Sequence, residues 1–214
     1  MPLRGRVITQ ATGRLWLVGE LVVLFGLSAA CREPSGGACD QSPLTAKNAA
    51  AIAADCLAHF NARGDSKAGL RALEAQALGK DKTGAEALST RLRQRPDGTT
   101  LEGDVLFTMA QLYADVSDPR ARTTWQQASL RLAATGDHKR AAQAAMSQSR
   151  LAWQAAEYQE SLLALDRAHT EGQAANDRPL MTRALLGFVL LLYELGDLPG
   201  AGRALEAQAL GKDK

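Results

Sequence analysis

A regular spacing of turns is the feature that most restricts how this chain can fold. Glycine ends helices in the left-handed conformation, and an aspartate after it caps the next helix through its side-chain oxygen. The stretches between the turns are long enough for about four to five helical turns. They therefore predict antiparallel helix pairs that repeat about every 40 residues. The candidate turns, close to 20 residues apart, fall at residues 117–119, 136–137, 155–156, 176–177 and 196–197.

The composition also favours helices over strands. Alanine and leucine dominate, with many glutamines, arginines and glutamates, all strong helix formers. Aromatic residues make up only 5% of the chain, and runs of valine, isoleucine and threonine are scarce. An all-α protein follows, and 214 residues suffice for one domain or a short repeat array.

One segment of the chain occurs twice. Residues 71–82 recur without change at residues 203–214, and the same offset of 132 places Gly64 on Gly196. Residues 83–100 interrupt the rhythm and are either an irregular insertion or an extra short helix. The chain stops where the second copy ends, without the polar capping helix that solenoids need. This ending has three interpretations. The chain is a truncated copy of a longer protein, the repeated segment reflects a recent duplication or a sequence-assembly fault, or the last helix pair docks on a partner.

Four helix pairs, at residues 50–82, 103–135, 142–175 and 182–214, resemble the tetratricopeptide repeat family. That family places bulky residues and a small one on the first helix of a pair, then a glycine turn, then Ala–aromatic–Ala on the second. The resemblance implies helix pairs stacked as an α-solenoid with a period of about 40 residues. The pattern is carried in residues 103–135 by Leu106, Met109, Ala110, Tyr113, Ala121, Trp125 and Ala128.

The same resemblance implies a concave groove lined by the first helix of each pair. Aromatic, methionine and arginine side chains of the kind found there are favoured at protein interfaces. The alternative prediction for Trp153, Leu186 and Leu190 is that they are buried in the core. Position by position, the expected groove holds Asp104, Phe107, Gln111, Gln143, Met146, Arg150, Trp153, Arg183, Leu186, Leu190 and Tyr193.

Residues 1–30 have the pattern of a secretory signal peptide. Three arginines and no acid lie in residues 1–14, and a mostly apolar stretch follows to residue 30. This stretch is shorter than a membrane-spanning helix needs and contains Glu20. The small residues before Cys31 resemble a bacterial lipobox, which implies cleavage before Cys31 and a lipid, including palmitate, on the mature N-terminus. The alternatives are an ordinary signal peptide cut near Ala30, an uncleaved anchor, or a cytosolic chain.

The sequence then divides into a lipidated N-terminus with a flexible tether at residues 31–46 and a repeat domain at residues 47–214. Arg32 follows the cysteine where aspartate would retain an enteric lipoprotein at the inner membrane, so the resemblance implies an outer-membrane protein facing the periplasm. In that oxidising compartment Cys39 and Cys56 either form a disulfide bond or remain a free and a buried thiol.

No pattern of catalytic residues or of a cofactor site occurs. His59, His138 and His169 are isolated, and no metal-ligand spacing, nucleophile elbow, P-loop or dinucleotide fingerprint is present. Beyond residue 30 basic and acidic residues are equal in number, which argues against nucleic-acid binding. We therefore expect no enzyme, no metal and no cofactor.

The expected function is a membrane-anchored scaffold of the bacterial cell envelope that binds a protein or peptide in its groove. The alternative is a sensor or regulatory repeat segment of a longer protein whose catalytic domain, a protease or kinase, lies beyond residue 214. A third option is self-association through the uncapped C-terminal end.

Overall fold

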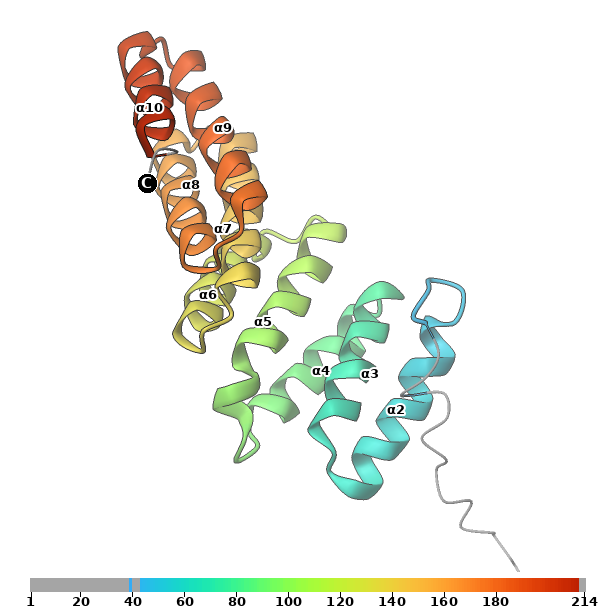
Figure 1. The fold of residues 1–214 in the computed structure, drawn as a ribbon. Coiled ribbons are helices and arrows are strands. Elements are labelled where there is room, and N and C mark those ends of the chain that lie inside the picture. The colour runs from blue at the N-terminus through green and yellow to red at the C-terminus, as the bar shows by residue number, and fades with distance from the viewer. Residues whose placement is uncertain (1–38, 40–42, 212–214) are drawn as a thin grey trace, which may run out of the picture. The chain divides into compact units, whose positions relative to one another are not determined.

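The computed structural model describes residue 39 and residues 43–211, and this part of the chain is built from helices without strands (Figure 1). Successive helices pack on one another in neighbouring pairs, so the expected all-α helical-repeat fold is confirmed. The predicted signal peptide at residues 1–30, Cys31 and most of the predicted tether lie outside the described residues. The helices are α2 (Ala49–Arg63), α3 (Ser66–Leu78), α4 (Lys82–Arg93), α5 (Gly98–Asp115), α6 (Ala121–Ala134), α7 (His138–Gln154), α8 (Tyr158–Ala174), α9 (Arg178–Glu194) and α10 (Leu198–Gly211).

Most of the turns between helices share one backbone geometry. After α6, the Gly136 N–H donates to the Ala133 carbonyl at 3.0 Å and the Asp137 N–H to the Leu132 carbonyl at 2.9 Å, the hydrogen bonds of a Schellman turn. The Asp137 carboxylate then accepts from the Arg140 N–H and caps α7. This geometry confirms the predicted turns. The residues with positive φ at such turns are Lys80, Ser117, Gly136, Ala156, Asn176 and Gly196.

Replacing Ala156 with glycine should stabilise the protein by about 1 kcal/mol, because alanine pays a steric penalty at its φ of 59° that glycine avoids. The matched change is Gly136→Ala, where φ is 85° and an added Cβ would meet no atom within 4 Å. It should cost a similar amount through the backbone alone. Urea denaturation of both variants tests this, and equal midpoints for both and for the wild type would contradict it.

Alanines fill the interfaces between α7, α8 and α9. Ala145 on α7, Ala168 on α8 and Ala184 on α9 are fully buried and form one cluster. Small side chains let neighbouring helices approach closely, which packs the interior without large residues. The hydroxyl of the buried Ser161 donates to the Ser149 carbonyl at 3.1 Å, so this polar group is satisfied inside the interface.

Larger side chains form the core of α2 to α5. Leu73 on α3 and Leu92 on α4 are fully buried in it, together with Ile52 and Cys56 of α2. Cys56 forms a disulfide bond with Cys39, with 5.0 Å between their Cα atoms. Of the two alternatives for these cysteines, the structure therefore has the bonded one, and it ties Cys39 to the first described helix.

Helix α4 is the extra short helix that the sequence left as one of two alternatives. Asp81 starts it by accepting a hydrogen bond from the Gly84 N–H at 3.0 Å. Helix α3 contacts α4 and α5 as well as α2. Helices α3 and α5 are therefore direct neighbours in space, although α4 separates them in the chain.

An ion-pair cluster holds α4 against the turn between α5 and α6. The Asp118 carboxylate, 6% exposed, lies 2.9 Å from Arg120 Nη2 and 2.6 Å from Lys82 Nζ. Arg120 also reaches Glu86 of α4 at 2.6 Å and lies over the Tyr113 ring at 4.3 Å. Hydrogen bonds from Arg120, and then from Lys82, hold the pKa of Asp118 well below its usual range.

This lowered pKa predicts an acid-sensitive contact. A carboxylate with a depressed folded-state pKa contributes stability that is present above its unfolded pKa, about 3.9, and is lost as the pH falls below that value. Asp118→Asn should lower stability at pH 7 and reduce the further loss between pH 5 and pH 2. Thermal denaturation followed by circular dichroism across this range measures both effects. An equal loss on acidification in both proteins would contradict the assignment.

Candidate partner-binding surfaces

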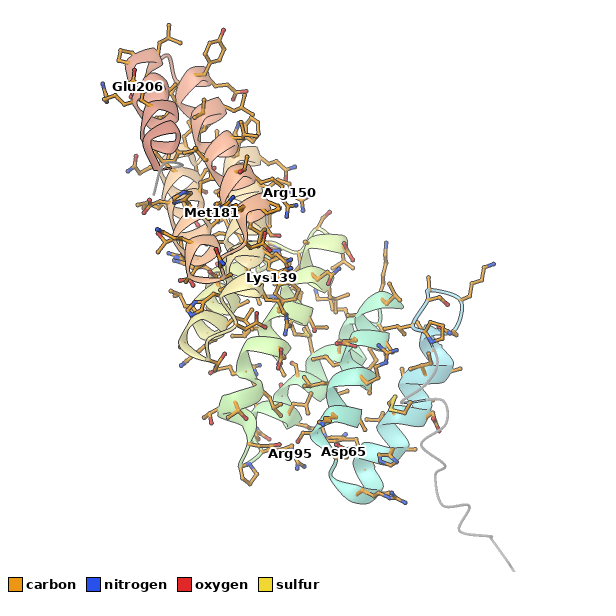
Figure 2. All side chains as sticks on the ribbon, viewed as in Figure 1. Asp65, Arg95, Lys139, Arg150, Met181 and Glu206 are labelled. Carbon is orange, nitrogen blue, oxygen red and sulfur yellow. A yellow bond between two sulfur atoms is a disulfide. The ribbon has the colours of Figure 1, made fainter. Side chains whose placement is uncertain are left out.

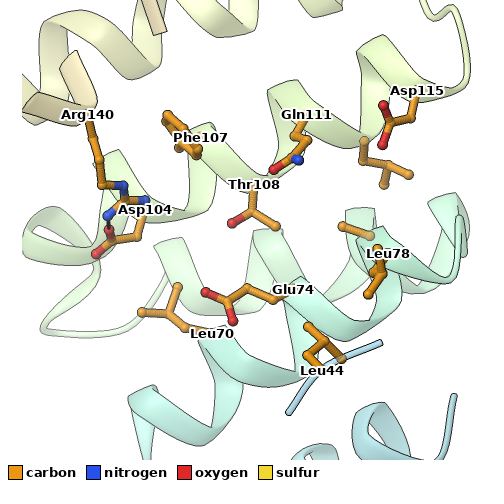
Figure 3. A pocket seen from close by; sticks show the side chains of 12 residues that line it. Leu44, Leu70, Glu74, Leu78, Asp104, Phe107, Thr108, Gln111, Asp115 and Arg140 are labelled. Carbon is orange, nitrogen blue, oxygen red and sulfur yellow. Dashed lines mark hydrogen bonds and ion pairs between the residues drawn. The ribbon is translucent and has the colours of Figure 1, made fainter. Parts of the chain in front are cut away.

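A hollow lies between α3 and α5, and we name it the α3–α5 hollow (Figure 3). Its volume is about 540 Å³, within the range of about 300–1,000 Å³ that is usual for ligand pockets. Three sets of residues line it: Leu70, Glu74, Ala77 and Leu78 from α3, Asp104, Phe107, Thr108, Gln111, Leu112 and Asp115 from α5, and Leu44 and Arg140 from outside these helices.

One end of the α3–α5 hollow is a fixed ionic and aromatic contact. Arg140 from the start of α7 pairs with Asp104, and its guanidinium lies 4.7 Å from the centroid of the Phe107 ring. Phe107 in turn meets Trp125 edge to face, with 5.0 Å between ring centroids. Asp137, the cap of α7, lies 3.6 Å from Arg140. This guanidinium is therefore already engaged by two carboxylates and a ring.

A second surface runs along α9, and we name Arg183, Leu186, Leu190 and Tyr193 the α9 row. Their spacing of three, four and three residues places them on one face of the helix. Leu186, Leu190 and Tyr193 are 49%, 56% and 64% exposed. The buried residues of α9, Leu180, Ala184 and Leu191, occupy other positions and hold the helix on its neighbours. Trp153 at the end of α7 adds a further exposed aromatic side chain.

The structure separates the expected groove residues into three groups. Asp104, Phe107 and Gln111 line the α3–α5 hollow. Gln143 and Met146 are half-buried, and Met146 packs on the alanine cluster of α7, α8 and α9. The remaining six are exposed. They are Arg150 (labelled in Figure 2), Trp153, Arg183, Leu186, Leu190 and Tyr193.

The alternative that placed Trp153, Leu186 and Leu190 in the core is wrong. These side chains are 43% or more exposed because α7 and α9 bury their alanine faces instead. Leu70, Glu74 and Leu78 of α3, which line the α3–α5 hollow, were not among the expected groove residues. The repeat pattern made α3 a second helix, and the sequence signal that would have found it is the aspartate cap of α4 at Asp81.

The histidines and carboxylates of the described residues form no cluster of metal ligands. Within residues 43–211, no three His, Cys, Asp or Glu side chains are placed to hold a metal ion. His138 Nδ1 lies 2.8 Å from a Glu171 oxygen, and His59 Nε2 lies 3.6 Å from Asp65. Each of these contacts joins one histidine to one carboxylate. In the same residues no helix is both long and apolar enough to cross a membrane.

No family model, curated protein or solved structure matches this chain. The described residues offer two surfaces to a partner: an acidic and apolar hollow between α3 and α5, and an apolar row on α9 that includes Arg183.

Proposed function

We propose that this chain is a protein-binding scaffold of the tetratricopeptide type, anchored to the bacterial outer membrane by a lipid on Cys31. The α9 row is the observation that carries the binding function. Water-exposed apolar side chains gathered on one helix face are costly unless a partner covers them. We propose no catalytic activity for this chain.

The chemistry of the α9 row favours an amphipathic helix as its partner. Apolar residues spaced by three and four are the arrangement by which two helices pack along a shared seam. Arg183 lies in the row, and Arg150 is exposed near Trp153 on α7. Acidic residues beside the apolar edge of the partner helix would complement both guanidiniums. We therefore propose a helix with leucine-like anchors and flanking carboxylates.

Site-specific photo-crosslinking tests this proposal. A benzophenone amino acid is introduced at Leu190 of the full chain, expressed in a Gram-negative host with its signal sequence. Leu163 on α8, 59% exposed, is the matched control because it is equally accessible but lies outside the row. We expect a defined crosslinked partner at Leu190, identified by mass spectrometry and absent at Leu163. Equal, diffuse crosslinking at both positions would overturn the proposal.

The lipid anchor has a test of its own. An acylated N-terminus with more than one chain anchors a protein firmly, since each buried CH₂ contributes about 0.8 kcal/mol. Cells fed an alkyne analogue of palmitate should label the wild-type chain and leave Cys31→Ser unlabelled. The variant should also leave the membrane fraction. Labelling that persists in Cys31→Ser would contradict the assignment of the lipid to this residue.

A further inference from the structure

We infer that the α3–α5 hollow binds a partner segment that carries a cationic side chain next to apolar ones. This inference deepens the proposed scaffold function and depends on it, because it assigns a ligand class to a second surface of the same helix array. Its occupant is a segment of another protein, and the charge and shape of the lining decide its chemistry.

The charge of the lining excludes an acidic segment. Glu74, Asp104 and Asp115 contribute three carboxylates against the single guanidinium of Arg140. Arg140 is held by Asp104 and Asp137 and stacked on Phe107, so binding an anion there would have to break existing contacts. Asp104 is paired with Arg140 and Glu74 with Arg71, so Asp115 is the lining carboxylate that has no ion pair among the described residues, and it favours a cationic ligand.

Glu74 and Asp115, the lining carboxylates that are not paired with Arg140, indicate where the cationic group of the ligand binds. Glu74 lies 3.2 Å from Arg71 on its own helix and is 48% exposed, so its ion pair is a surface contact that solvent screens. Asp115 is exposed and forms no ion pair within the described residues. Figure 3 shows Asp115 at the opposite end of the hollow from the Asp104–Arg140 pair. A lysine or arginine of the ligand should therefore point toward Asp115.

The apolar lining specifies the rest of the ligand. Leu70 and Phe107 flank the hollow toward the Arg140 end, and Leu44 and Leu78 lie toward the other end (Figure 3). Leu78 is 41% exposed, which leaves apolar surface for a ligand to cover. Thr108 and Gln111 stand between these side chains and can hydrogen-bond to a peptide backbone. A ligand with apolar side chains along the hollow and a cationic group at Asp115 therefore matches the lining.

Binding of a short peptide to the full-length chain, purified in a non-ionic detergent, tests the inference. The probe is Leu-Ser-Leu-Ser-Lys-Lys with blocked ends and a neutral fluorophore, and its counterpart carries glutamate in place of lysine. Anisotropy titrations should give at least about tenfold tighter binding of the lysine peptide. The Asp115→Asn/Glu74→Gln double variant should weaken that binding about tenfold, since each exposed pair contributes up to about 1 kcal/mol.

Asp166→Asn, which removes an exposed carboxylate from α8, is the matched control and should change the affinity by less than about twofold. Equal affinity for the two peptides, or an equal loss in Asp166→Asn, would overturn the inference. Unchanged helicity by circular dichroism shows that the double variant is folded. A specific crosslink at Leu190 with no charge preference in the hollow would leave the scaffold function standing and remove only this inference.

Discussion

Replacing Leu73 with alanine is expected to lower the free energy of unfolding by about 3 kcal/mol. Leu73 lies on α3, is fully buried, and belongs to the core cluster formed by α2 to α5. Removing three buried carbon atoms forfeits their transfer free energy and leaves a cavity that the surrounding helices close only in part. Helix α3 contacts α2, α4 and α5, so the cavity affects four helices together.

Thermal and urea denaturation of the two proteins measure this loss. For a chain of this length, 3 kcal/mol corresponds to a fall in the melting temperature of about 6–12 °C. Leu163→Ala provides the control, because Leu163 is 59% exposed and should lose less than about 0.5 kcal/mol. A loss below about 1 kcal/mol in Leu73→Ala would mean that α3 is not packed among α2, α4 and α5.

The helix boundaries in the second half of the chain were predictable because spacing and residue type agree there. Gly136 and Gly196 occupy left-handed positions that glycine accepts without a steric penalty, and each precedes an aspartate cap. Ala156 and Asn176 occupy the same conformation without being glycine. The Asn176 turn still carried a residue signal, because asparagine tolerates this conformation and Asp177 caps α9. The Ala156 turn could be predicted only from the 20-residue rhythm, since the conformation is disfavoured for alanine.

The α3–α5 hollow was not predicted, because the turn that it depends on has the aspartate cap at Asp81 but no glycine at its left-handed position. Lys80 has a φ of 58° where a glycine would have marked a helix end, and Gly79 before it has ordinary right-handed angles. The start of α4 was therefore left open, and so was the contact between α3 and α5. The residues of the α9 row, by contrast, were expected in the groove from the resemblance to the repeat family. The sequence could not say whether its leucines face solvent or the core, since both faces of α9 are apolar.

Loss of the Cys39–Cys56 disulfide is expected to lower the free energy of unfolding by about 3 kcal/mol, the loop-closure value for residues 17 positions apart. Cys56 is fully buried beside Ile52 and Phe60 in the core of α2 to α5. The bond therefore restricts the unfolded chain at the point where the first described helix joins that core. The loss should appear in reduced wild type and in Cys39→Ala/Cys56→Ala.

The measurement is made in a Cys31→Ser background, so that the chain holds only this pair of the three cysteines. Denaturation with and without reductant should differ in that background and coincide in the double alanine variant. The stability of the protein should also depend on the compartment of expression, because disulfides persist in the periplasm and are rare in the cytosol. A chain that begins at residue 32 and is expressed in the cytosol should therefore be obtained in the less stable, reduced form. Equal stability of the oxidised and reduced proteins would mean that the α2–α5 core holds the segment around Cys39 without the bond.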